Sequence, residues 1–203
     1  MNDSRQCAEV RVRGKAVRLA VFWMCVSTTL PLGHPHMFMD AMATFMLTDS
    51  GLAGFHVYWD FDQMNSTMIL EEFDADGNGR FEQSEIEKVR RDAFEYAAKS
   101  NYFTSFAWGL ESLLINRVED FAVAVIPGGK LRYSFFVPCD LALEKIEGKE
   151  ISIFFEDPTM YIAFALKKNL VQVSTNEQLS CGIRFGKVDY VDRIILTITR
   201  KDS

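Results

Sequence analysis

The stretch His36–Phe61 reads HMFMDAMATFMLTDSGLAGFHVYWDF and decides the fold class. It holds two runs rich in apolar and aromatic residues, 36–47 and 55–61, on either side of the segment Thr48-Asp-Ser-Gly51. Two such runs around a polar, glycine-containing turn predict an antiparallel β-hairpin. We therefore expect a fold built mainly from β-sheet.

The position of this turn sets the register of the hairpin. A turn centred on Ser50 places His56 opposite Thr44, about eight residues from His36 along the ladder. At ~3.3 Å per residue the two histidines lie over ~25 Å apart, which makes His56 a poor candidate for sharing a ligand with His36. The same register places Asp40 opposite Asp60 and Asp62 opposite Phe38. Like charges directly opposite one another are unfavourable unless they are neutralised.

The rest of the chain beyond the hairpin reads as two helical stretches followed by many short strands. The helical stretches are Gln63–Phe73 and Ser84–Lys99, separated by a loop rich in glycine and aspartate. Expected strands follow at 102–107, 119–126, 131–137, 151–155, 161–166, 170–174 and 194–199. Many short strands with regular turns are typical of packed sheets. The predicted fold is α+β: one β-rich domain over 34–203, mainly an antiparallel β-sandwich with a helix–loop–helix inserted at about 62–100.

The N-terminal residues have the pattern of a secretory signal peptide. Four basic residues between Arg11 and Arg18 precede an uncharged run, 19–32, which is too short to span a bilayer comfortably. Cys25 follows Phe-Trp-Met, so the usual lipid-attachment pattern is missing. We expect residues 1–33 to be removed and the protein to be periplasmic and not embedded in the membrane. A buried N-terminal helix or a single membrane anchor are the alternatives.

The charge balance of the chain is acidic. It has 203 residues, 28 of them acidic and 22 basic, for a net charge of −6. Without residues 1–33 the balance becomes 26 acidic against 17 basic residues. A nucleic-acid partner would favour a basic surface, so we expect none.

Residues 74–85 read DADGNGRFEQSE and match the twelve-residue EF-hand calcium loop at every defining position. Gly79 stands at position six, where the loop turns sharply. The expected Ca²⁺ ligands are Asp74, Asp76, Asn78, the carbonyl of Arg80, Glu82 and Glu85. A solvated acidic turn is the alternative. A single loop between β segments favours a structural calcium ion over a sensor.

His34-Pro-His36 begins the exported chain if cleavage follows Gly33. Two imidazoles at a free end can bind Zn²⁺, Ni²⁺ or Co²⁺. Asp62 is a candidate third ligand, although an N-cap of the following helix is the alternative role for its side chain. Pro35 lacks the amide that the amino-terminal copper and nickel motif requires. Two alternatives remain open. The histidines are partly exposed residues at the start of a strand and bind no metal, or they form the histidine brace of a copper oxidase, which would need a further histidine close by.

Cys139 and Cys181 are the two cysteines that remain after removal of the leader. In an oxidising compartment they favour a disulfide. No Gly-x-Ser-x-Gly elbow, phosphate loop or dinucleotide fingerprint is present. The sequence therefore does not indicate an enzyme.

Five segments taken together resemble a bacterial family called domain of unknown function 1007. They are HPHMFMDA (34–41), WDFD (59–62), the loop 74–85, NYFT (101–104) and DPTMYIAF (157–164). The resemblance implies an exported, periplasmic component of an uncharacterised transport system, encoded beside nickel/cobalt-type or zinc permeases. It implies metal handling and an inner-membrane metal permease as partner, and it implies no enzymatic activity.

Residues and resemblance together predict a periplasmic metal-binding accessory protein of a membrane transition-metal (zinc, nickel or cobalt) transport system, with a structural calcium site. The alternative is a calcium-dependent interaction module of the cell envelope with no transition-metal role.

Overall fold

The predicted hairpin is formed by strands β1 (Met37–Thr48) and β2 (Gly51–Phe61). Thr44 pairs with His56 and Asp40 with Asp60, so the register expected from the turn is confirmed. A bulge between Met46 and Leu47 shifts the pairing next to the turn. Gly51 has a φ of 138°, and a Cβ there would collide with the backbone of residues 141–143, so the turn requires glycine at this position.

The computed structural model describes residues 35–174 and 178–201, all within one unit that spans 33–203. The expected leader, 1–33, and His34 lie outside the described residues.

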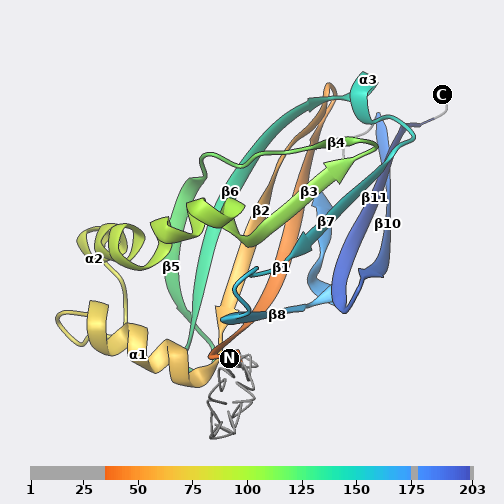
Figure 1. Ribbon diagram of the computed structural model, residues 1–203. Helices are drawn as coiled ribbons and strands as arrows, with labels where there is room; N and C mark the ends of the chain where they lie inside the picture. The colour runs from red at the N-terminus through yellow and green to blue at the C-terminus, as the bar shows by residue number, and fades with distance from the viewer. Residues whose placement is uncertain (1–34, 175–177, 202–203) are drawn as a thin grey trace, which may run out of the picture. The chain divides into compact units, whose positions relative to one another are not determined.

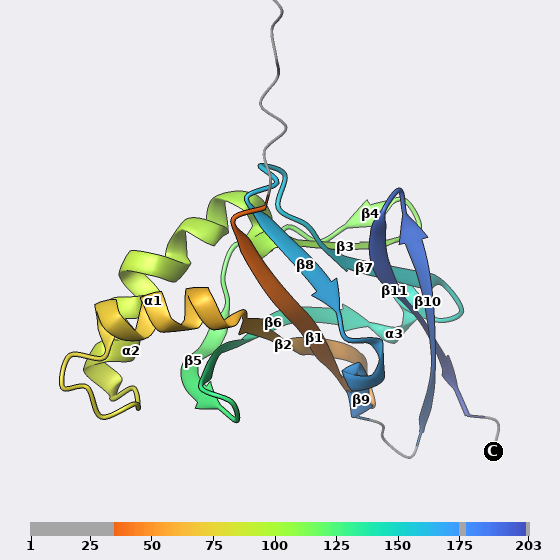
Figure 2. The same ribbon diagram turned by 90° about the horizontal axis from the view of Figure 1, so that it is seen from below.

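The first sheet has the hairpin at its centre (Figures 1 and 2). Its strand order is β5-β6-β2-β1-β8, with β9 also pairing with β1. The added strands are β5 (Glu119–Ile126), β6 (Lys130–Ala142), β8 (Ile162–Leu166) and β9 (Gln172–Ser174). Strands β8 and β9 run parallel to β1, whereas the other pairs in this sheet are antiparallel. The C-terminal strands β8 and β9 therefore pair with β1 in the parallel direction, which the turn residues of the sequence do not predict.

The second sheet is antiparallel throughout the described residues, in the order β10-β11-β7-β3-β4. Its strands are β3 (Thr104–Trp108), β4 (Glu111–Ser112), β7 (Glu150–Phe155), β10 (Leu179–Val188) and β11 (Val191–Arg200). The sequence analysis did not predict β10. It is an edge strand whose side chains are mostly exposed or half-buried, although its apolar residues Leu179, Cys181, Ile183 and Phe185 alternate with small or polar ones.

One hydrophobic core serves both sheets. Phe55 of β2 stacks on Phe106 of β3, with ring centroids 5.5 Å apart. Trp59 is 2% exposed and lies among aromatic rings of several elements, including Phe135 of β6 and Phe164 of β8. Two largely antiparallel sheets with few helices confirm the α+β class.

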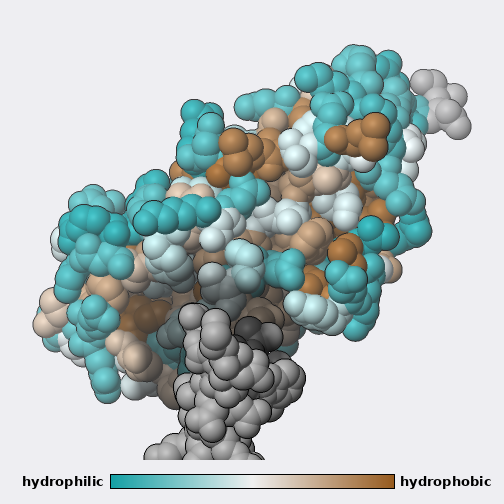
Figure 3. All heavy atoms as spheres, in the orientation of Figure 1, coloured by the Kyte–Doolittle hydropathy of each residue, from teal (hydrophilic) through white to brown (hydrophobic). Residues whose placement is uncertain are grey.

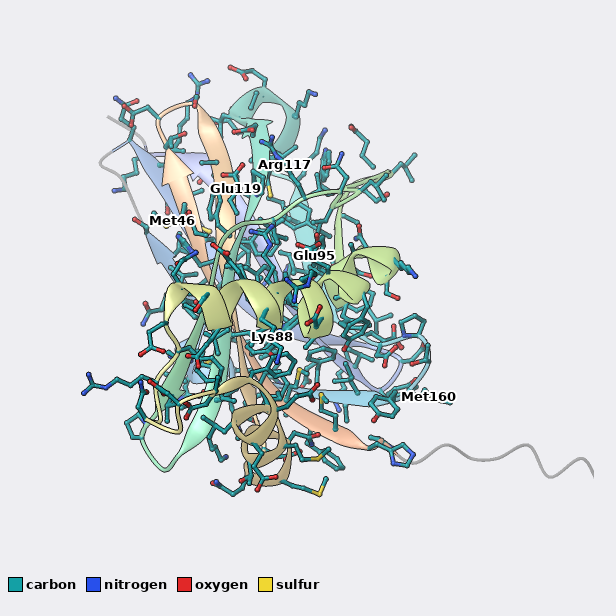
Figure 4. The ribbon with its side chains drawn as sticks, turned by 90° about the vertical axis from the view of Figure 1, so that its left-hand side faces the viewer. Met46, Lys88, Glu95, Arg117, Glu119 and Met160 are labelled. Atoms are coloured by element: carbon teal, nitrogen blue, oxygen red, sulfur yellow. The ribbon has the colours of Figure 1, made fainter. Side chains whose placement is uncertain are left out.

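The helical insertion contains α1 (Gln63–Phe73) and α2 (Gln83–Val89), followed by a π-helical turn, η1 (Arg90–Phe94), and a 3₁₀ segment, η2 (Glu95–Phe103). Figure 4 labels Lys88 of α2 and Glu95 of η2 on the helical insertion. The stretch expected to be helical over 84–99 is helical throughout, but its second half changes from α-helical to π- and 3₁₀-helical geometry. The strand expected from 102 begins only at Thr104, because Asn101, Tyr102 and Phe103 all have positive φ. Two further short helical turns are α3 (Leu143–Ile146) and η3 (Lys168–Leu170).

Candidate metal centre

The loop between α1 and α2 brings three acidic side chains together. Carboxylate oxygens of Asp74, Asp76 and Glu85 all lie within 4.8 Å of one another. Asp74 directly follows the last residue of α1, and Glu85 lies in the first turn of α2. The two helices thus hold the ends of the loop close enough for both carboxylates to reach one point.

Backbone N–H groups inside the loop orient these carboxylates. The N–H of Gly79 donates to Oδ2 of Asp74 at 2.8 Å, and the N–H of Asn78 donates to Oδ1 of Asp76 at 3.0 Å. Gly77 and Gly79 have φ of 68° and 73°, so the backbone can turn back over the acidic side chains. The loop is therefore wrapped around its own carboxylates.

The remaining predicted ligands lie in the same hydrogen-bond network. The Nδ2 of Asn78 donates to Asp76 Oδ2 and to Glu82 Oε1, both at 2.8 Å. The Oδ1 of Asn78 accepts from the N–H of Arg80 at 2.8 Å. Hydrogen bonds from Asn78 therefore connect it to the side chains of Asp76 and Glu82 and to the backbone of Arg80.

Glu85 is the most enclosed of the three clustered carboxylates, with 7% of its surface exposed. Its two oxygens accept from the N–H of Glu82 at 3.0 Å and the N–H of Ala75 at 2.7 Å. These backbone hydrogen bonds lower the pKa of Glu85 below its usual value. The side chain is therefore ionised at neutral pH, and both of its oxygens are held at fixed positions. Ionised, preorganised oxygen donors are the kind that Ca²⁺ prefers.

The proposed transition-metal ligands have different surroundings. His36 is exposed at the start of β1, and its ring centroid lies 5.2 Å from that of Tyr161. Asp62 is the N-cap of α1, and its carboxylate accepts hydrogen bonds from Asn65 and Phe38. Within 35–174 and 178–201, the only cluster of at least three metal-ligating side chains is that of Asp74, Asp76 and Glu85. Because His34 lies outside the described residues, the set His34, His36 and Asp62 stays a prediction.

The cysteine pair differs from the expectation. Cys139 lies in β6 of the first sheet and Cys181 in β10 of the second, and both are free thiols. The expected disulfide is therefore absent from the structure. Burial raises the pKa of Cys139 to about 12, with a further contribution from Asp140, and it raises the pKa of Cys181 to about 11. The two cysteines lie on different sheets, and their positions in the sequence do not show this.

A feature that the sequence analysis missed is a pocket of about 250 Å³ beside the helical insertion, lined by residues that include Trp59, Tyr133 and Tyr96. In the sequence, only the aromatic residues of the sheet and of the insertion could have indicated this pocket, and such residues are more often part of a core.

Among the described residues, no helix is long and apolar enough to cross a membrane.

Comparisons with known proteins reveal two uncharacterised relatives. A protein of Haemophilus influenzae is 27% identical over 135 residues, which is 65% of this chain and 62% of that protein. The 15.5 kDa protein in the trpE 3′ region of Spirochaeta aurantia is 28% identical over 101 residues, or 50% of this chain and 70% of that protein. The chain thus matches less than two thirds of the length of the Haemophilus protein. A family model described as protein of unknown function (DUF1007) matches residues 19–194, and the chain belongs to this family.

Proposed function

We propose that the protein is an exported calcium-binding protein whose loop 74–85 holds one Ca²⁺ ion in the manner of an EF-hand. The observation that carries this proposal is the convergence of Asp74, Asp76 and Glu85 within 4.8 Å. Side-chain oxygens of Asp74, Asp76 and Asn78 supply positions one, three and five, and the carbonyl of Arg80 supplies position seven. Glu82 binds directly or through water, and Glu85 binds with both oxygens.

The ion has a structural role in this proposal. Three carboxylates in one small volume repel one another, and a divalent cation removes that repulsion. The same loop joins α1 to α2. Lys88 of α2 also contacts the end of α1: it donates to the carbonyl of Glu72 at 3.4 Å and lies 5.0 Å from the ring centroid of Phe73. Calcium therefore fixes the angle between the two helices. Exported modules bind Ca²⁺ with Kd of about 10⁻⁴–10⁻³ M, and we expect that range here.

Calorimetric titration of the purified protein with CaCl₂ tests this proposal. The wild-type protein should bind one equivalent, and Glu85→Gln should abolish binding because it removes the bidentate carboxylate. Glu87→Gln is the matched control, since Glu87 is an exposed glutamate on the same helix. Equal binding by wild type and Glu85→Gln, or no binding by wild type, would show that the loop is only a solvated turn.

A second proposed role is capture of Zn²⁺, Ni²⁺ or Co²⁺ by His34 and His36 for an inner-membrane metal permease. What favours it is the exposure of His36 at the start of β1, where an imidazole can bind an incoming ion. Asp62 can join this set only by giving up hydrogen bonds that hold α1. Titration with ZnCl₂ and NiCl₂ should therefore show binding that is lost in His34→Ala/His36→Ala and kept in Asp62→Asn.

The alternative role, a calcium-dependent interaction module of the cell envelope, makes the opposite prediction. Chelation of Ca²⁺ would then abolish partner binding, and the double histidine variant would behave as wild type. N-terminal sequencing of protein released from the periplasm tests export directly, and it identifies the residue that follows the cleaved leader.

A further inference from the structure

A pocket of about 250 Å³ lies between the first sheet and the helical insertion. On the face seen in Figure 3, apolar side chains gather in a hollow beside the insertion. Three of the residues that line the pocket, Met68, Tyr96 and Tyr161, are about half exposed, so the pocket opens to solvent between them. One face of α1 also lines it, with residues spaced three or four apart: Asn65, Met68, Ile69 and Glu72.

The side-chain oxygen of Asn65 is an unused hydrogen-bond acceptor in this wall. Asn65 is 6% exposed, and its Nδ2 donates to Oδ2 of Asp62 at 2.8 Å. A carboxylate only accepts hydrogen bonds, so the amide nitrogen must face Asp62 and Oδ1 is left for another partner. This Oδ1 accepts no hydrogen bond from any described residue, yet it keeps accessible surface, unlike the fully buried Nε1 of Trp59 and hydroxyl of Tyr133. The pocket thus offers an acceptor to a ligand that can donate.

The charged side chains in the wall are both acidic. Glu72 of α1 and Asp92 of η1 are exposed and line the pocket, and none of its described lining residues is basic. Asp92 is paired with Arg91 at 2.7 Å. Lys88 contacts the backbone carbonyl of Glu72, and the Glu72 carboxylate itself has no ion pair or hydrogen bond with a described residue. The free charge at the pocket is therefore negative, which favours a cation over an anion.

Glu72 and Asn65 act on the same pocket from two turns of one helix. Burial raises the pKa of Tyr133, and the neighbouring Tyr96 and Glu72 raise it further, so the charge of Glu72 is felt in the pocket wall. Glu72 follows Asn65 by seven residues, which is about 10 Å along the helix axis. Helical side chains lean toward the N-terminus, and the longer side chain of Glu72 shortens that separation. The pair suits a ligand with a hydrogen-bond donor at each end of a short apolar body.

The size and lining of the pocket limit that body to one ring. At ~30 Å³ per water molecule, the volume equals that of about eight waters, which suits a benzene ring with a short substituent. Met37 and Met68 can adapt to the outline of a ring. The rings of Tyr96 and Tyr161 at the opening attract a cation through their faces.

We propose that this pocket binds a small aromatic amine, in which a benzene ring carries a hydroxyl group at one end and a protonated alkylamine at the other. The hydroxyl group donates to Oδ1 of Asn65, and the ring packs among the apolar side chains. The ammonium group pairs with Glu72 at the opening. This binding is separate from the proposed metal roles, and its test is made at constant, saturating CaCl₂.

Calorimetric titration with three related probes tests the proposal. Tyramine has both groups, 2-phenylethylamine lacks the hydroxyl group, and 4-ethylphenol lacks the amine. The wild-type protein should bind tyramine more tightly than either of the others. Asn65→Ala should weaken binding of tyramine and 4-ethylphenol by about five- to tenfold, the effect of one lost hydrogen bond, and leave 2-phenylethylamine unchanged. Glu72→Gln should weaken binding of both amines by about three- to fivefold, as expected for a partly exposed ion pair, and leave 4-ethylphenol unchanged.

Two further variants locate the site and guard against misfolding. Glu71→Gln is the matched control, since Glu71 is an exposed glutamate of α1 that does not line the pocket, and it should bind all three probes as wild type does. Ala93 lines the pocket and is half-buried, so Ala93→Leu should fill it and abolish binding of every probe. Near-ultraviolet circular dichroism verifies the fold of each variant. The proposal is overturned if the wild type binds none of the probes, if it binds all three equally, or if folded Glu72→Gln and Asn65→Ala bind tyramine as wild type does.

Discussion

The backbone N–H of Phe38 donates to Oδ2 of Asp62 at 3.0 Å, and the N–H of Asp62 donates back to the carbonyl of Phe38 at 3.0 Å. The other carboxylate oxygen, Oδ1, accepts from the N–H of Asn65 at 2.8 Å. One side chain therefore extends the hairpin pairing by a residue, begins α1 and fastens the helix to β1. This role gives the aspartate a structural function at the junction of the sheet and the insertion.

Asp62→Ala should destabilise the protein by about 1–2 kcal/mol, because it removes the N-cap of α1 and the link to Phe38. Asp62→Asn should cost much less, since asparagine is an equally good N-cap. Urea unfolding followed by circular dichroism measures both. Equal stability of Asp62→Ala and wild type would contradict the capping role.

Acid should weaken the protein through Asp62 and Glu85. Burial raises the pKa of Asp62, but hydrogen bonds from Asn65, Phe38 and Met64 outweigh burial and lower it below 3.8. Hydrogen bonds from Glu82 and Ala75 lower the pKa of Glu85 below 4.5. A carboxyl whose pKa is lower in the folded state stabilises the protein above its unfolded pKa, and this contribution is lost as the pH falls through the folded pKa. Urea midpoints measured in EGTA should thus be constant near neutral pH and decline below about pH 4.5. Asp62→Asn should make the decline of the urea midpoint with falling pH less steep. An equally steep decline in this variant would contradict the contribution of Asp62 to acid sensitivity.

The facing aspartates of the hairpin are neutralised by two cations. Arg132 lies 2.5 Å from Asp60, and Lys167 lies 2.9 Å from Asp40. Arg132→Met keeps the side-chain stem but leaves Asp60 largely buried opposite Asp40, so we expect a loss of about 1–3 kcal/mol. The double variant Asp60→Asn/Arg132→Met should recover much of that loss in thermal unfolding.

The control for this pair is Arg184→Met. Arg184 forms an ion pair with Glu150 in which both side chains are more than half exposed, and such pairs contribute about 0–1 kcal/mol. Equal losses of stability in Arg132→Met and Arg184→Met would show that the facing aspartates do not need a neutralising cation.

Gly79→Ala should weaken Ca²⁺ binding, because alanine is strained at a φ of 73° and relief of that strain displaces the N–H that orients Asp74. Gly79→Asn should bind better than Gly79→Ala, since asparagine tolerates positive φ. Gly109→Ala has the same backbone strain outside the loop, with a φ of 59° and no atom within 4 Å of the added Cβ. It should leave calcium titrations unchanged, and an equal effect of both alanine variants would contradict a specific role of the loop.

The cysteines should react slowly in the folded protein. With pKa values of about 12 for Cys139 and about 11 for Cys181, iodoacetamide at pH 8 should modify both at least ~100-fold more slowly than an exposed cysteine of pKa about 8.5. In urea without reductant, peptides containing either residue should carry the label. A cross-linked pair of these peptides in the mass spectrum would instead demonstrate the disulfide.

Much of the local structure followed from short stretches of sequence. The turn at Thr48–Gly51 determines the register of β1 and β2, because a hairpin turn joins neighbouring residues and leaves few pairings open. The bounds of α1 and β5 were also predicted, since an N-cap aspartate and a Pro-Gly-Gly turn mark where they begin or end. The acidic loop was recognisable because the spacing of its acidic and glycine residues is a property of twelve consecutive residues.

Pairings between distant segments were not predictable in the same way. Strands β8 and β9 reach β1 after more than a hundred intervening residues, and nothing in their own sequence marks the parallel direction. The helix expected over 84–99 changes to a π-turn and a 3₁₀ segment, which helical periodicity does not reveal. Asn101 stabilises the end of this segment through hydrogen bonds of 2.6 Å to Thr104 and Ile115, and Ile115 lies fourteen residues away.

The sequence by itself determined the α+β class, the central hairpin, the position of the helical insertion and the arrangement of the acidic loop. Each of these depends on neighbours along the chain, whose contacts are set by turn chemistry and side-chain periodicity. Only the tertiary structure decided that the carboxylate of Asp62 also contacts β1, that Cys139 and Cys181 lie on different sheets, and that Trp59 and Tyr133 line one pocket. Those relationships arise when distant segments pack together to bury apolar surface, so the sequence specifies them only through the completed fold.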